Sequence, residues 1–195
     1  MRLLSDMSVM DFEAALTSTE VRVSQIIQGA LASGIALFLT IVVLMYVLMD
    51  GAAPTAQENL RVVNLLSLVH IGLAVALYGV SQRLYDAQFA EPRLSQRLGM
   101  EMRDMQGRVI DDPAQKCLYL MRSAMIIRLA CYEGAALFGL VVCLLAVVTG
   151  VLHAYPLYWL NALTSVLVLG HLITTLPTAD RLKSVFLAKI KKAMV

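Results

Sequence analysis

Four long apolar stretches alternate with more polar segments along the chain. A helix rises 1.5 Å per residue, so about 20 apolar residues cross the roughly 30 Å of hydrocarbon in a bilayer. The stretches that reach this length are Ile26–Met49, Val62–Val80, Ala124–Thr149 and Tyr155–Leu176. The pattern therefore predicts an all-α protein with four membrane-spanning helices.

The flanking residues predict where the helices begin and end. Thr17 followed by Glu20 is typical of a capping box, which indicates a helix that begins before the first span. Asp112-Pro113 combines an N-cap residue with proline at the first helical position, so the third helix is expected to begin there. Stop signals follow three of the stretches: Asp50-Gly51 with Pro54 after the first, Gly150 after the third and Pro177 after the fourth.

Two shorter amphipathic segments are predicted outside the spans. Ser8–Leu16 precedes the first span, and a second helix is expected from Glu91-Pro92 to Gly107. The apolar residues of that second helix fall on one face: Leu94, Leu98, Met102 and Met105. We expect this face to rest on the membrane or the bundle, or to dock a partner.

Composition supports a membrane environment. Of the 195 residues, 59% are apolar and 15% are charged, whereas soluble domains are about 45–50% apolar and about 25% charged. The formal net charge is only +2, which does not favour nucleic acid as a partner. The lipid bilayer is the predicted surrounding.

The distribution of cations predicts the orientation. Lys and Arg concentrate in the N-terminal tail, the middle connection and the C-terminal tail, while the other two connections contain only Arg61. Positively charged segments stay in the cytoplasm, so both termini and the middle connection are expected there. The predicted location is a bacterial inner (plasma) membrane or a mitochondrial inner membrane.

These features divide the chain into five predicted segments. They are a cytoplasmic N-terminal amphipathic segment (1–25), a first transmembrane hairpin (26–83), a cytoplasmic connection with an amphipathic helix (84–122), a second transmembrane hairpin (123–177) and a basic cytoplasmic tail (178–195).

An internal repeat relates the two hairpins. Shifting the sequence by 100 residues aligns Arg22 with Arg122, Gly34 with Gly134 and Phe38 with Phe138, together with several apolar residues. A repeat of two crossings returns to its starting side, so the halves are expected to be parallel. The predicted architecture is a four-helix bundle of two parallel helical hairpins, with both termini cytoplasmic.

Glu133 is the main candidate site residue. It lies seven residues beyond Ile126, roughly 10 Å inside the predicted boundary. A carboxylate at this depth must be neutral or paired, and it is either functional or hydrogen-bonded to a neighbouring helix. His171 is the first expected partner, and Arg128 is a second candidate that points to another helix face.

The run Glu133–Leu144, EGAALFGLVVCL, resembles the carboxylate helix of proteolipid (c or K type) subunits of rotary ATPases. The resemblance implies that Glu133 binds a transported proton or sodium ion. The chain departs from that family in its longer middle connection, in fewer glycines on the neighbouring helices, and in placing the acid on the first helix of a hairpin. We therefore expect the chain to be a distant relative of that family or a case of convergence, and not a rotor-ring subunit.

Histidines suggest a different class of function. His70 and His171 lie 101 residues apart, nearly one repeat, and two such imidazoles can ligate a haem b. The alternative is that each histidine forms hydrogen bonds with another helix. Interhelical hydrogen bonds are also expected from Asn64, Ser67, Asn161, Thr164, Ser165, Thr174 and Thr175, and close helix contact is expected at Gly139. No protein metal site is predicted, because further ligands at suitable spacing are absent.

The sequence contains no motif for a catalytic nucleophile, a phosphate-binding loop or a dinucleotide. We therefore expect no enzyme and no resident cofactor. The leading hypothesis is a noncatalytic subunit of a larger membrane complex, associated with other subunits or with itself, in which Glu133 is a structural anchor or a proton-binding group. The alternatives are a small b-type cytochrome and a proteolipid-like ion-translocating subunit.

Overall fold

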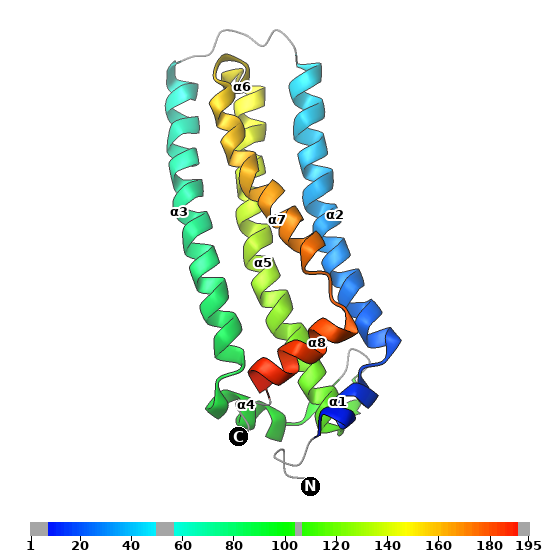
Figure 1. Ribbon diagram of the computed structural model, residues 1–195. Coiled ribbons are helices and arrows are strands. Elements are labelled where there is room, and N and C mark those ends of the chain that lie inside the picture. The colour runs from blue at the N-terminus through cyan, green and yellow to red at the C-terminus, as the bar shows by residue number, and fades with distance from the viewer. Residues whose placement is uncertain (1–7, 50–56, 104–106, 191–195) are drawn as a thin grey trace. The chain divides into compact units, whose positions relative to one another are not determined.

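The computed structural model describes residues 8–49, 57–103 and 107–190. Helices dominate this part of the chain (Figure 1). The elements are α1 (Val9–Ala15), α2 (Ser18–Leu48), α3 (Gln57–Gln88), α4 (Glu91–Gly99), β1 (Met102–Arg103), β2 (Val109–Ile110), α5 (Pro113–Val148), α6 (Val151–Ala154), the 3-10 helix η2 (Pro156–Ala162), α7 (Leu163–Thr174), α8 (Ala179–Val185) and the π-helical segment η3 (Phe186–Ile190).

Four helical segments of the described chain are long and apolar enough to cross a membrane. They are α2, α3, α5 and the continuous segment Pro156–Thr174 that joins η2 to α7. The prediction of an all-α chain with four apolar helices is confirmed. Since Asp50, Gly51 and Pro54 lie outside the described residues, the structure does not bear on the stop signals after the first span.

Local hydrogen bonds explain where these helices begin and end. The Glu20 N–H donates to Thr17 Oγ1 (3.3 Å) at the start of α2, and the Ala114 N–H donates to Asp112 Oδ1 (3.1 Å) at the start of α5. Such bonds satisfy backbone donors that have no partner within the helix. Gly150, with φ of 72°, takes the left-handed conformation just after α5. These predicted boundaries are confirmed.

The amphipathic helix after Glu91 is shorter than predicted. α4 ends at Gly99, Met102 belongs to β1, and Gly107 (φ 79°) lies between β1 and β2. Lys116 Nζ of α5 donates to the carbonyls of Leu98 (3.2 Å) and Met100 (2.9 Å). These bonds cap the C-terminal end of α4, which is the physical reason that the helix ends there. Met105 lies outside the described residues.

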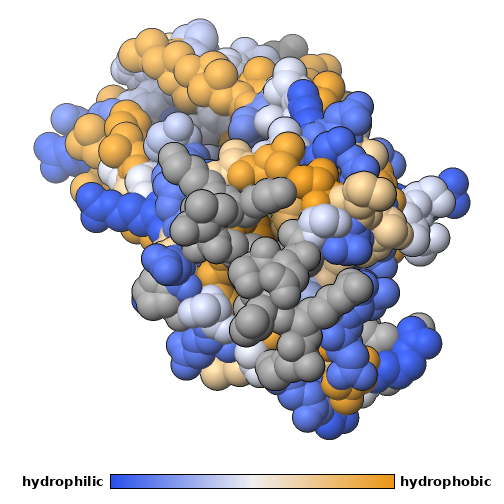
Figure 2. Space-filling view, turned by 60° about the horizontal axis from the view of Figure 1, so that its bottom comes forward, coloured by the Kyte–Doolittle hydropathy of each residue, from blue (hydrophilic) through white to orange (hydrophobic). Residues whose placement is uncertain are grey.

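The chain forms two compact units, and the first comprises Met1–Ile27, Gln82–Arg128 and Leu176–Val195. Its core contains the stacked rings of Phe12 and Phe186 (centroids 4.1 Å apart), surrounded by apolar residues that include Leu94 and Leu98. The two leucines confirm the buried face of α4. Ion pairs join Glu20 to Arg122, Glu13 to Lys183 and Asp86 to Lys189. Figure 2 shows many hydrophilic residues on the end where α1, α4 and α8 lie, with hydrophobic residues between them.

The second unit comprises Gln28–Ser81 and Leu129–Thr175. Within it, α2 and α5 run in one direction, and α3 and α7 run in the other (Figure 1). The helices α2 and α3 lie on opposite sides of α5 and α7. Gln28 Nε2 ties α2 to the Leu172 carbonyl of α7, and Ser165 Oγ ties α7 to the Ala136 carbonyl of α5 (3.0 Å).

Burial differs among the four candidate spans. In the most apolar window of each helix, 50% of the residues of α5 are buried, against 11% in α2 and 11% in α3. The most buried of these helices is thus α5, whereas most residues of α2 and α3 in these windows are not buried within the chain.

Candidate functional site

A set of polar contacts joins α3 to η2 and α7, and we call these six residues the polar ladder: Asn64, Ser67, His70, Tyr158, Asn161 and Thr164. The Tyr158 hydroxyl donates to Asn64 Oδ1 (2.5 Å), and Asn161 Nδ2 donates to Ser67 Oγ (2.9 Å). Thr164 Oγ1 lies 3.2 Å from His70 Nε2. Each pair is 94 residues apart, so the two parallel helices keep one register over three steps.

The 3-10 helix makes this register possible. Residues three apart share a face in a 3-10 helix, whereas they are offset by about 60° in an α-helix. Tyr158 and Asn161 therefore face α3 one above the other. The predicted single helix from Tyr155 is corrected here, because its first two turns are a 3-10 helix that begins at Pro156.

His70 lies at the centre of the polar ladder, with 2% of its surface exposed. Its Nδ1 is 3.0 Å from Asn161 Oδ1. Since the Asn161 side-chain oxygen can only accept, Nδ1 carries the hydrogen of this bond, and Nε2 faces the Thr164 hydroxyl. Both ring nitrogens of His70 are thus hydrogen-bonded within the protein.

Gly139 of α5 closes the polar ladder from the side. A Cβ atom at this position would collide with the Asn161 carbonyl oxygen and would lie 2.7 Å from His70 Nε2. Such separations are too short for any side chain, so glycine is what lets α5 pack directly against the imidazole. The sequence predicted close helix contact at Gly139 but did not indicate His70 as the residue it meets. The predicted interhelical hydrogen bonds of Asn64, Ser67, Asn161, Thr164 and Ser165 are confirmed, and Thr175 accepts one from Gln28 of α2 (3.4 Å). The prediction is wrong for Thr174, because its hydroxyl donates to carbonyls of its own helix.

The two histidines proposed for haem have different surroundings. His171 packs edge-on against the Tyr132 ring (centroids 5.4 Å apart), while His70 uses both nitrogens and has Gly139 against its ring. These contacts do not fit a haem held by His70, because ligation would require the imidazole to leave Asn161 and Thr164. A visible spectrum of the purified chain tests the hypothesis: a Soret band that is lost in His70→Ala would support it.

Glu133 lies on α5 and faces α2. Its Oε1 is 3.6 Å from the point where a Cβ of Gly34 would be, an ordinary van der Waals separation, so the carboxylate lies beside Gly34 of α2. Glu133 is half-buried, and among the described residues none donates a hydrogen bond to its carboxylate. Among the described residues, the carboxylate therefore has no charge partner.

The two predicted partners of Glu133 have other neighbours. His171 lies against Tyr132, as described above. Arg128 belongs to the first unit, where its guanidinium lies over the Tyr85 ring at 4.5 Å from the centroid. This is a cation–π contact, which retains the charge of the arginine beside an aromatic face.

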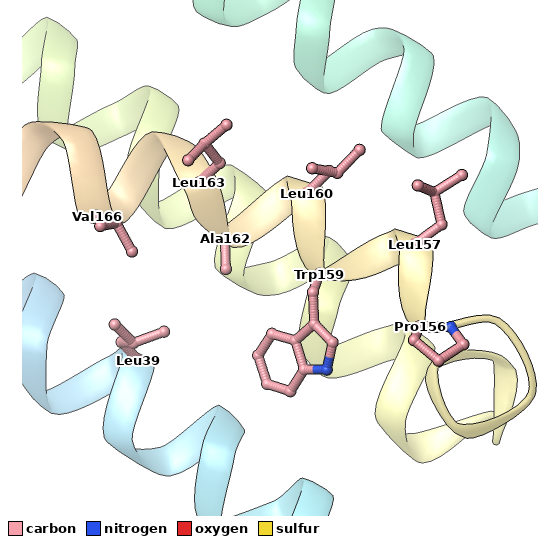
Figure 3. Close-up of a pocket in the computed structure, with 8 residues that line it drawn as sticks. All are labelled: Leu39, Pro156, Leu157, Trp159, Leu160, Ala162, Leu163 and Val166. Carbon is pink, nitrogen blue, oxygen red and sulfur yellow. The ribbon is translucent and has the colours of Figure 1, made fainter.

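A cavity of about 450 Å³ lies beside η2 and α7 (Figure 3). Trp159 and Val166 point toward the side where Leu39 of α2 lies, whereas Leu157 and Leu160 point the other way. Apart from the indole N–H of Trp159, the lining side chains are apolar. The cavity therefore supplies no chemistry of its own. In the described part of the chain, no group of three or more His, Cys, Asp or Glu could hold a metal ion.

No protein-family model, curated protein or solved structure matches this chain. Its function is therefore inferred from the residues and their geometry.

Proposed function

We propose that this protein is a noncatalytic, multi-pass subunit of a larger membrane protein complex, in which Glu133 is the intramembrane anchor or a proton-binding group. The observation that supports this proposal is the position of the Glu133 carboxylate. It lies on an apolar helix, half-buried at Gly34, with no donor among the described residues.

The physical reason is the free energy needed to place an ionised carboxylate in hydrocarbon. An ionised side chain near the bilayer centre costs about 2.5–3.5 kcal/mol on insertion scales. The intrachain contacts at Glu133 do not offset this cost, so the carboxyl group either takes up a proton or meets a donor from another molecule. Both outcomes give the residue a role beyond the folding of its own chain.

The outer faces of α2 and α3 also support association. Large apolar side chains such as Leu37, Leu44, Leu65 and Leu68 are more than half exposed. In a membrane these faces contact lipid or other helices. A small protein with two such faces and no catalytic motif is suited to a place among other subunits.

The proposal includes the topology. Both termini and the middle connection lie in the cytoplasm, because 15 of the 16 Lys and Arg residues fall in these segments or at the adjoining helix ends. We propose a bacterial inner membrane or a mitochondrial inner membrane as the location. The common direction of α2 and α5 supports duplication of an ancestral helical hairpin with parallel halves.

Purification in a mild detergent tests the proposed function. We expect the tagged chain, expressed in its natural host, to migrate in native mass measurements as a defined assembly well above its own 21.3 kDa. The same partner polypeptides must recur at fixed stoichiometry across detergents. A protein that remains a single chain under all mild conditions would contradict the proposal.

The second candidate function is proton binding by Glu133. It is favoured by the same lack of a donor, since a protonated carboxyl group is the uncharged alternative to a partner. A hydrophobic carbodiimide reacts with a protonated carboxyl group inside a membrane. If the group is protonated, labelling is expected at Glu133, is absent in Glu133→Gln, and is retained in Glu58→Gln, a control in the first turn of α3.

A further inference from the structure

Glu133 and the faces of α2 and α5 beside it point to a partner of defined chemistry. We propose that this surface docks a transmembrane helix of another protein that carries a single Lys or Arg at the depth of Glu133. The inference rests on the proposed function and specifies the partner.

The first argument is charge complementarity. The sequence has no Lys, Arg, Asp or Glu from residue 23 to 49 or from 62 to 82, and Glu133 is the only one from residue 129 to 179. The four spans therefore contain an acid without a base in the region around Glu133. Because a charge pair costs less in hydrocarbon than an isolated charge, a cation from a second chain is the fitting complement.

The second argument is steric. Exposed positions form a continuous strip on α2 that includes Ala30, Gly34 and Leu37, and exposed Ala130 and Gly134 flank Glu133 on α5. Small residues let two helix backbones approach closely in a membrane. The Glu133 carboxylate lies directly beside the exposed Gly34, within 4 Å of where a Cβ of that residue would be. A long cationic side chain that follows this strip can therefore reach the carboxylate.

A second copy of this chain is a poorer occupant. A twofold contact brings the same face of each copy together, which would place Glu133 opposite Glu133. The nearest arginine along α5 is Arg128, five residues or about 7.5 Å away along the helix axis, and it lies over Tyr85. Self-association through this face would therefore bring together two acids and no base at that depth.

A defined probe tests the proposal. Synthetic Leu/Ala transmembrane peptides carry one Lys near the centre, and a series moves that Lys along the helix by one turn at a time. The control peptide has Leu in its place. Each fluorescent peptide is reconstituted with labelled full-length protein in phosphatidylcholine vesicles, and association is measured by energy transfer.

We expect one Lys position to bind at least tenfold more tightly than the control peptide. Glu133→Gln should abolish this preference, whereas Glu58→Gln, which removes an acid in the first turn of α3, should preserve it. Equal affinity for the Lys and Leu peptides would overturn the inference. So would energy transfer between two copies of the protein that is lost in Glu133→Gln, because it would identify a second copy as the occupant.

The experiment separates the inference from the proposed function. If native complexes form equally with Glu133→Gln and no Lys preference exists, the subunit proposal stands and the inference fails. If a Lys peptide binds specifically but the chain is a monomer in every mild detergent, the docking surface is supported and the constitutive subunit proposal fails.

Discussion

The second unit contains two polar regions that differ in how far their polar groups are hydrogen-bonded within the chain. In the polar ladder, every step pairs a side chain of α3 with one of η2 or α7, and His70 is hydrogen-bonded at both nitrogens. At Glu133, a carboxylate that can accept several hydrogen bonds receives none from the described residues. The polar ladder is hydrogen-bonded within the chain, whereas we propose that Glu133 takes up a proton or meets a donor from another molecule.

The difference indicates how structural and functional polar groups can be distinguished here. Satisfied hydrogen bonds in an apolar surrounding fix the register of two helices, and they lose energy when one member is removed. An acid without a hydrogen-bond donor lowers the stability of the isolated chain. Protonation of the acid, or a donor from another molecule, would offset this cost. Substitutions in the two regions should therefore have opposite effects on stability.

The largest effect is expected from Gly139→Ala. The added methyl group would meet the Asn161 carbonyl and the His70 ring, so backbone must move, and we expect a loss of about 3 kcal/mol in the free energy of unfolding. Denaturant unfolding in mixed detergent micelles, followed by circular dichroism, measures it. Gly72→Ala is the control, since nothing lies within 4 Å of a Cβ there. Equal stability of the two variants would contradict the described packing.

The next effect is expected from Asn161→Leu. This change removes the partner of His70 Nδ1 and the donor to Ser67, and we expect a loss of about 2 kcal/mol. The same unfolding measurement applies. Thr40→Val is the comparison, because Thr40 bonds only to the Ala36 carbonyl of its own helix and is exposed. A cost at Asn161 no larger than at Thr40 would show that the polar ladder does not hold α3 to α7.

Glu133→Leu should have a smaller effect of opposite sign. Removal of an unpartnered carboxyl group from an apolar helix should leave the isolated chain as stable as before or more stable, by about 1 kcal/mol. Unfolding of the purified chain in the same micelles measures this change. A marked loss of stability would show that Glu133 has a structural partner within the chain, which would remove the main support for the proposed function.

The smallest effect is expected at the surface of the first unit. The hydrogen bond and charge of Glu13 hold the pKa of Lys183 above its ordinary value of 10.5. A raised pKa means that the stabilising contact is present at neutral pH and is lost as the pH rises through the folded-state pKa. An NMR titration of the Lys183 side chain should give a midpoint above 10.5 in the native protein and a lower one in Glu13→Gln. Identical midpoints would contradict the ion pair.

Much of the fold could be predicted from local signals. Apolar length predicted the four spans, and Thr17, Asp112 and Gly150 marked helix ends that the structure confirms. These signals work because a helix satisfies its own backbone, so its length and caps depend on neighbours in sequence. The helix after Glu91 was predicted too long because its end depends on Lys116, which is distant in sequence.

The residues alone also indicated that Glu133 is unusual, since a lone acid in an apolar run is visible without a structure. They could not indicate which groups surround it or that it lies beside Gly34, because that contact joins α2 and α5. The same holds for the 3-10 turns of η2 and for Gly139 against His70. Hydrophobic periodicity encodes which face of a helix is apolar, but packing between helices fixes which polar groups meet and which are left without a partner.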